Sequence, residues 1–132
     1  MKKWIYALIA VLMLPGMSLA LDGNEMLQAC KIAIRVNDYN DRNPGNRFGI
    51  AKCSYYVAGF KEAVEFNEDW LDERDKNLGY GTYRFLCVPD DVTIMQVIGA
   101  FVNYMEQHPE DLNYPAYSIL TMTFLEVFPC LK

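Results

Sequence analysis

Hydrophobic residues recur three or four positions apart in several stretches of the chain, which is the spacing of one face of an α-helix. The first stretch opens at Asp22, and Glu25 three positions later completes a pattern that resembles a capping box. Apolar positions then continue at helical spacing to Ile34. Residues 37–46 are rich in side chains that favour turns. The pattern predicts a first helix from Asp22, followed by a connecting loop.

A second helix is predicted from about Phe48 to about Phe66, with apolar residues on two faces. One face holds Ala51, Tyr55, Ala58, Gly59 and Ala63, and the other holds Cys53, Val57, Phe60 and Val64. A helix that is apolar on both sides is expected between neighbours. Because Gly59 is costly inside a helix, we expect it to permit the close approach of another backbone. The acid-rich residues 62–77 are compatible with one extra short helix.

The third helix has the clearest boundaries. Thr93 and Gln96 form a T-x-x-Q capping box at its start, and Pro109 ends it. The last helix is predicted from about Pro115 to Pro129. No stretch alternates between apolar and polar positions as a strand would. We therefore predict an all-α fold, a compact bundle of four main helices.

The first 20 residues have the order of a secretory signal peptide. Lys2 and Lys3 precede eleven apolar residues, and small residues at Ser18 and Ala20 mark a cleavage site after Ala20. The alternative, a membrane anchor, needs about 20 apolar residues. We expect export to a bacterial periplasm, a mature chain of one helical domain over residues 21–132, and no membrane attachment after cleavage.

All four cysteines, Cys30, Cys53, Cys87 and Cys130, lie in the mature part of the chain. No two are closer than 23 residues, whereas a zinc site places two ligands close together on a turn. Two disulfides in an oxidising compartment are therefore expected. Because helices joined by short loops pack antiparallel, we predict Cys30–Cys53 and Cys87–Cys130 pairs.

The mature chain is acidic, with all 17 acidic residues and ten of the 12 basic ones. This balance disfavours nucleic acid as a partner, since phosphate contacts need a basic face. Its one histidine, His108, precedes Pro109, and neither Ser54 nor Ser118 has the setting of a catalytic nucleophile. Adjacent carboxylates lie in polar stretches typical of a solvated helix face. We therefore predict no enzyme, and neither a metal nor another cofactor.

A small exported protein without a catalytic site is expected to act by contact with a partner. The acid-rich stretch would attract a basic partner, and Trp70 is of the kind favoured as an interface anchor. The turn between the last two helices is a second candidate surface. The candidate partner-binding residues are Glu68, Asp69, Trp70, Asp72, Glu73, His108, Glu110, Asp111 and Tyr114.

Five short motifs resemble, in order and spacing, the Rap/Tai-type immunity proteins of bacterial type VI secretion systems. They are CSYYVAG at 53–59, LCVPDDVT at 86–93 with Gln96, QHPE at 107–110, Ala116, and FPC at 128–130. The resemblance implies an all-helical, disulfide-braced periplasmic protein, commonly a homodimer. It also implies a function, which is to bind a peptidoglycan amidase toxin injected by sister cells and to occlude its cleft.

The matching motifs are structural, so the resemblance transfers no toxin-contacting residue. A scaffold can also serve several functions. The alternative from another class is a periplasmic acid-stress chaperone, which would expose apolar surface as its carboxylates become protonated.

Overall fold

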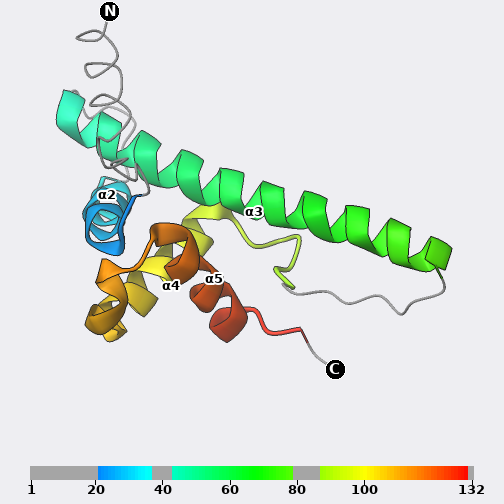
Figure 1. Ribbon diagram of the computed structural model, residues 1–132. Coiled ribbons are helices and arrows are strands. Elements are labelled where there is room, and N and C mark those ends of the chain that lie inside the picture. Colours follow the sequence, from blue (N-terminus) through cyan, green and yellow to red (C-terminus); the bar gives the residue numbers. More distant parts are fainter. Residues whose placement is uncertain (1–20, 37–42, 79–86, 131–132) are drawn as a thin grey trace, which may run out of the picture.

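The computed structural model describes residues 21–36, 43–78 and 87–130. Their helices are α2 (Gly23–Arg35), α3 (Pro44–Leu78), α4 (Ile94–Gln107), the 3-10 helix η1 (Pro109–Asn113) and α5 (Ala116–Val127) (Figure 1). These residues contain no strand, and one isolated antiparallel bridge joins Asp22 to Pro115. The predicted all-α fold with four main helices is confirmed. The proposed signal peptide and the residues between α3 and Cys87 lie outside the described residues.

The helix α3 is longer than predicted, because it begins at Pro44 and runs without interruption to Leu78. The first residues of α3 were predicted to belong to the loop. Proline suits a first helical turn, and the Asn43 side chain accepts a hydrogen bond from the Gly45 amide at 3.0 Å. The predicted extra helix is the second half of α3, since nothing between Phe66 and Leu78 breaks a helix. Its 35 residues span about 52 Å.

The predicted helix starts at Asp22 and Thr93 are confirmed. The Asp22 carboxylate accepts a hydrogen bond from the Glu25 amide at 2.9 Å, which caps α2. At α4 the Thr93 hydroxyl accepts from the Gln96 amide at 3.3 Å, and the Gln96 side chain accepts from the Thr93 amide at 2.8 Å. Both contacts satisfy amides that a helix start leaves without a partner.

The hydrophobic core lies where α2, α4 and α5 pack beneath the first half of α3 (Figure 1). The largest fully buried side chains are Phe101, Phe124, Met26, Ile98, Met105, Ile119 and Leu120. On α3 the last fully buried side chain is Val57, and Phe60 and Val64 pack against the edge of the core. The second half of α3 therefore extends past the core.

The prediction that both apolar faces of the second helix are buried is wrong. The face with Cys53 and Val57 is buried, but Tyr55, Gly59 and Ala63 are exposed. Among the described residues, nothing lies within 4 Å of a Cβ atom placed at Gly59, so Gly59 does not serve close packing against them. The described helices cover only one side of α3.

Gly23 is the glycine that allows a close approach. A Cβ atom there would lie 2.8 Å from the carbonyl oxygen of Leu112 and 2.9 Å from its Cα. The Gly23 amide donates to the Tyr114 carbonyl at 3.1 Å, and the Ala116 amide donates to the Leu21 carbonyl at 2.8 Å. The start of α2 is thereby joined to the entry of α5.

Both predicted disulfides are confirmed. Cys30–Cys53 joins α2 to α3, and both residues are fully buried. Cys87–Cys130 joins the segment before α4 to the segment after α5, and both residues are partly exposed. In the part of the chain that the structure describes, no helix is long and apolar enough to cross a membrane.

Candidate partner-binding surfaces

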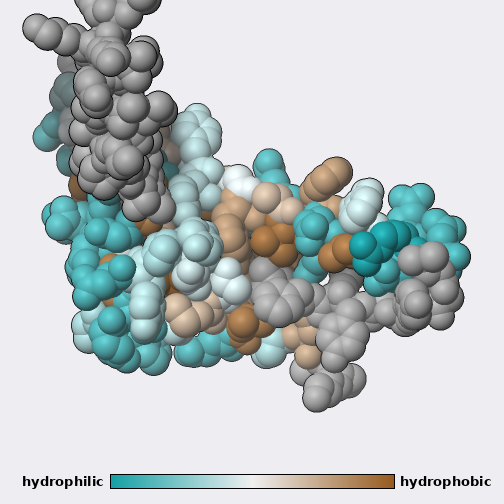
Figure 2. Space-filling model, viewed as in Figure 1, coloured by the Kyte–Doolittle hydropathy of each residue, from teal (hydrophilic) through white to brown (hydrophobic). Residues whose placement is uncertain are grey.

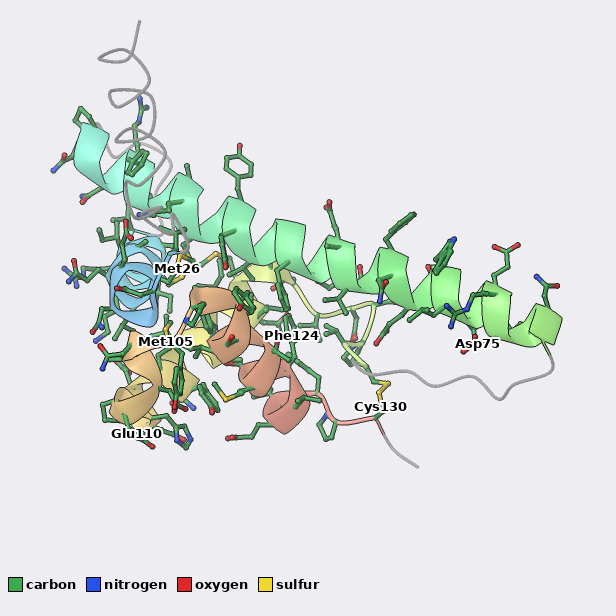
Figure 3. All side chains as sticks on the ribbon, viewed as in Figure 1. Met26, Asp75, Met105, Glu110, Phe124 and Cys130 are labelled. Carbon is green, nitrogen blue, oxygen red and sulfur yellow. A yellow bond between two sulfur atoms is a disulfide. The ribbon has the colours of Figure 1, made fainter. Side chains whose placement is uncertain are left out.

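The second half of α3, residues 62–78, projects beyond the other helices, and we call it the arm (Figure 1). It carries seven acidic and two basic residues. In Figure 3 its residue Asp75 lies far from the core residues Met26 and Met105. An acidic helix that stands away from the core is accessible along much of its length, which makes the arm a candidate docking element.

The structure divides the five candidate residues of the arm into two groups. Asp69, Trp70 and Glu73 are exposed, whereas Glu68 and Asp72 are half-buried. The Asp72 carboxylate pairs with the Lys76 ammonium one helical turn later at 2.6 Å, an arrangement that stabilises the helix itself. Trp70 lies under the Arg74 guanidinium, with the ring centroid 5.5 Å from Cζ. The exposed group is therefore better placed for a partner.

A hollow of about 290 Å³ lies between α3, the segment after Cys87 and α5. Its polar wall includes Lys61 and the carboxylates of Glu65, Glu68, Asp69 and Asp90. The Lys61 ammonium pairs with Glu65 on the same helix. The hollow carries a net negative charge, which suits a basic side chain of a protein partner. Among the residues that the structure describes, no group of three or more His, Cys, Asp or Glu side chains could hold a metal ion.

The second candidate region is the turn from α4 through η1, which we call the corner. The His108 ring stacks on Tyr104 with centroids 4.4 Å apart, and His108 Nδ1 lies 3.3 Å from a Glu110 carboxylate oxygen. A backbone hydrogen bond and the His108 ring lower the pKa of Glu110. The Tyr104 hydroxyl donates to Asp111 at 3.2 Å, and burial, with this bond, raises the pKa of Tyr104.

These contacts fix the shape of the corner and form no nucleophile–base pair. The described partners of His108 are Glu110 and Tyr104, neither of which is a serine or cysteine nucleophile. Tyr114, the last candidate residue, is exposed, and its carbonyl bonds to Gly23. In Figure 3 Glu110 and Asp75 lie at opposite ends of the molecule, so the arm and the corner form separate surfaces.

The chain has been compared with known proteins. A family model described as "Rap1a immunity proteins" matches residues 22–130. The chain belongs to this family. No curated protein and no solved structure matches it.

As a Rap1a immunity protein, the chain has a toxin as its partner. The matched residues include every described helix and both disulfides. The motifs on which the sequence resemblance rests lie at structural positions, because Cys53 and Cys87 form disulfides, Thr93 caps α4, and His108 ends it. Family membership therefore accounts for the scaffold, while the toxin-facing surface has to be argued from exposure and charge.

One surface was missed by the sequence reasoning. Six residues of α3 point to solvent on the side opposite the core, and we call this set the aromatic face: Phe48, Tyr55, Gly59, Ala63, Phe66 and Trp70. Hydrophobic surface lies along the middle of α3 and hydrophilic surface at its far end (Figure 2). The spacing of seven, four, four, three and four residues is helical, so the pattern was present in the sequence. Three of its members, Tyr55, Gly59 and Ala63, were assigned to a second buried face of the predicted helix.

Proposed function

We propose that this Rap1a immunity protein acts in the periplasm, where it binds a peptidoglycan amidase toxin delivered by the type VI secretion system of sister cells and blocks the toxin's cleft. Membership of an immunity protein family is the observation that carries this proposal. The signal-like residues 1–20 and the two disulfides support an exported, oxidised protein. The homodimeric state that the resemblance implies is part of the same proposal.

Inhibition by exclusion needs only a rigid element that fills the toxin's substrate site. The arm has this form, since its 17 residues extend about 25 Å and a helix with side chains is about 10–12 Å wide. Its partner would be a papain-like cysteine amidase, with substrate excluded from the cleft for as long as the complex lasts. The immunity protein performs no turnover in this mechanism.

We assign two interactions with the toxin to the arm, namely electrostatic attraction and the burial of an aromatic side chain. Its negative field would accelerate association with a basic cleft rim. Glu68 and Asp69, on the wall of the acidic hollow, would receive a basic side chain of the toxin. Trp70 would supply buried apolar area, with Asp72 and Glu73 following it along the arm.

The corner is the second contact region that we propose. Its residues His108, Glu110, Asp111 and Tyr114 are held by the contacts described above. Because they lie at the other end of the molecule, substitutions there should act independently of substitutions in the arm.

Binding of the mature chain to its proposed partner, a purified peptidoglycan amidase toxin, tests the proposal. Asp69→Lys should slow association about tenfold at low salt, while Asp91→Lys, also at an exposed acidic residue, should have little effect. Trp70→Ala should raise the Kd about 30-fold, the equivalent of about 2 kcal/mol for an interface anchor. Tyr117→Ala is the matched control, because Tyr117 is 53% exposed and Trp70 is 55% exposed.

Two results would contradict the proposal. A failure of the wild-type protein to bind the amidase at neutral pH would remove the partner. Protection of unrelated proteins at low pH, together with binding of a hydrophobic dye, would favour the acid-stress chaperone instead. A complex that responds equally to the arm variants and their controls would place the toxin on another surface.

A further inference from the structure

The carboxylates of the arm differ in whether a basic side chain of the same helix already engages them. Three ion pairs within α3 involve carboxylates of the arm, and they are Lys61–Glu65, Asp72–Lys76 and Arg74–Asp75. These pairs use both basic residues of the arm. Among the described residues, no ion pair or hydrogen bond engages the side chains of Glu62, Asp69 and Glu73, and all three are exposed. These three carboxylates are therefore available to a partner.

The three available carboxylates share one side of the arm with two exposed aromatic rings. We call this set the docking stripe: Glu62, Phe66, Asp69, Trp70 and Glu73. Its members follow one another at spacings of four, three, one and three residues. Residues at these spacings lie along one side of an α-helix, so the five side chains form a continuous surface. The docking stripe includes the far end of the aromatic face and lies opposite the core.

Phe66 and Trp70 supply the apolar part of the docking stripe. Phe66 is 74% exposed and Trp70 is 55% exposed. Because a buried aromatic residue covers roughly 150–250 Å², the two rings together expose roughly 280 Å². They are one helical turn apart, so a single groove of a partner can bury both. This is the arrangement by which an amphipathic helix docks into a groove.

The charge of the docking stripe decides what kind of groove it fits. Glu62, Asp69 and Glu73 place three negative charges beside the two rings. Lysine or arginine side chains at the border of a groove would form charge-assisted hydrogen bonds with these carboxylates. The same cations are attracted to the faces of aromatic rings. A second copy of the stripe would instead bring like charges together, which is unfavourable, so the occupant is a different and basic protein surface.

The first half of the aromatic face lacks this combination. Phe48 and Tyr55 are exposed there, but residues 44–61 contain no acidic residue. The Lys52 ammonium lies 5.8 Å from the centroid of the Phe48 ring and pairs with Glu25 of α2. Along α3, exposed rings and available carboxylates therefore coincide on the arm.

We infer that the docking stripe seats the arm in an apolar groove of the toxin that is bordered by lysine or arginine. Phe66 and Trp70 fill the groove as two anchors, and the carboxylates of the stripe pair with its border. Asp69 also lies on the wall of the acidic hollow, so the contact reaches the hollow at this residue. The inference rests on the proposed function, to which it adds an orientation of the arm and two contact residues, Glu62 and Phe66.

Two phenylalanines of the aromatic face test the anchor. Phe66→Ala should raise the Kd for a purified peptidoglycan amidase toxin about 30-fold, as expected for a buried aromatic anchor. Phe48→Ala is the matched control, because it removes the same side chain, at 69% exposure, from the same helix outside the arm. The control should change the Kd less than about twofold. Isothermal titration calorimetry at neutral pH measures both values.

Two double variants separate direct contact from net charge. Glu62→Gln with Glu73→Gln removes two charges from the docking stripe, whereas Glu65→Gln with Asp75→Asn removes two charges from the rest of the arm. Both should slow association at low salt, because both weaken the long-range field of the arm equally. The first should also raise the dissociation rate about fivefold through the loss of short-range pairs, and the second should leave it unchanged. Surface plasmon resonance measures both rates.

A photo-crosslinking side chain locates the toxin directly. p-Benzoylphenylalanine in place of Phe66 should cross-link to the amidase, and in place of Phe48 it should not. The cross-linked toxin peptide should lie beside lysine or arginine residues. Circular dichroism with wild-type helix content in every variant would exclude misfolding as the cause of any loss.

The outcomes separate this inference from the proposed function. A wild-type protein that binds the amidase, with Phe66→Ala and Phe48→Ala responding equally, overturns the inference and leaves the proposed function standing. A loss of binding confined to Phe48→Ala overturns it as well and assigns the toxin to the first half of α3. Equal dissociation rates for the two double variants overturn the basic border. A wild-type protein that binds no amidase refutes the proposed function and the inference with it.

Discussion

The replacement of Gly23 by alanine is the perturbation whose effect the structure specifies most fully. Gly23 is the first residue of α2 and has a helical backbone, so alanine is conformationally allowed there. The added methyl group would meet the Ile119 side chain and would lie 2.8 Å and 2.9 Å from the carbonyl oxygen and Cα of Leu112. The isoleucine side chain can rotate. The Leu112 backbone moves less easily, because its carbonyl accepts a hydrogen bond from Asn24 at 3.1 Å.

The cost of Gly23→Ala follows from this crowding. Forcing one extra methyl group into a packed site costs about 1–3 kcal/mol. For a domain of this size, that corresponds to a fall in Tm of about 4–12 °C. Gly99→Ala is the matched control, since its methyl group enters open space in the interior of α4. It should stabilise the protein by about 0.5–1 kcal/mol through helix propensity.

Urea unfolding of both variants, followed by circular dichroism with the disulfides intact, measures the difference. The midpoint should shift in opposite directions for the two variants with an unchanged m value. If Gly23→Ala lies within 0.5 kcal/mol of wild type, the close contact between α2 and η1 does not constrain the fold. The account of this packing would then be wrong.

Three further predictions concern stability. Replacing Cys30 and Cys53 together with serine should cost about 3 kcal/mol from loop closure, and the buried serine hydroxyls add a further cost. Replacing Cys87 and Cys130, whose bridge is partly exposed, should cost about 4 kcal/mol from loop closure alone. Urea unfolding should therefore show the larger total loss of stability for the Cys30–Cys53 bridge. Thr93→Ala should lower the free energy of unfolding by about 1 kcal/mol through loss of the α4 cap, and no change would exclude a role for that cap. Tyr104 has a raised pKa in the folded state, so its contribution to the free energy of unfolding is complete below about pH 10 and is lost as the pH rises through that pKa. Tyr104→Phe should therefore flatten the decline in Tm above about pH 10. A steeper decline would contradict the assignment.

The elements that sequence reasoning predicted correctly depend on local chemistry. Asp22 and Thr93 cap helices through residues three positions away, which a single sequence displays directly. The disulfide pairing followed from antiparallel helices, because their ends necessarily meet. Such inferences need little knowledge of how the helices pack in space.

The elements that were predicted incorrectly depend on which neighbours the chain supplies. Periodicity identified two apolar faces on α3, but it does not reveal that the described helices cover only the face with Cys53 and Val57. Gly59 lies inside a helix and Gly23 at the start of one, and only the folded structure shows that Gly23 is the crowded one. The acidic run likewise gave no indication that Asp72 is half-buried and paired with Lys76 while Asp69 remains exposed.

The central claim, that this protein neutralises an amidase toxin by binding to it, is tested most directly by titration. The amidase toxin proposed as the partner is held at a fixed concentration well above the expected Kd, and the cleavage of peptidoglycan cross-links is measured as the mature immunity protein is added. We predict a linear fall in activity to zero at one chain per toxin molecule, with the immunity protein recovered intact. Full amidase activity at a tenfold excess of the protein would contradict the claim.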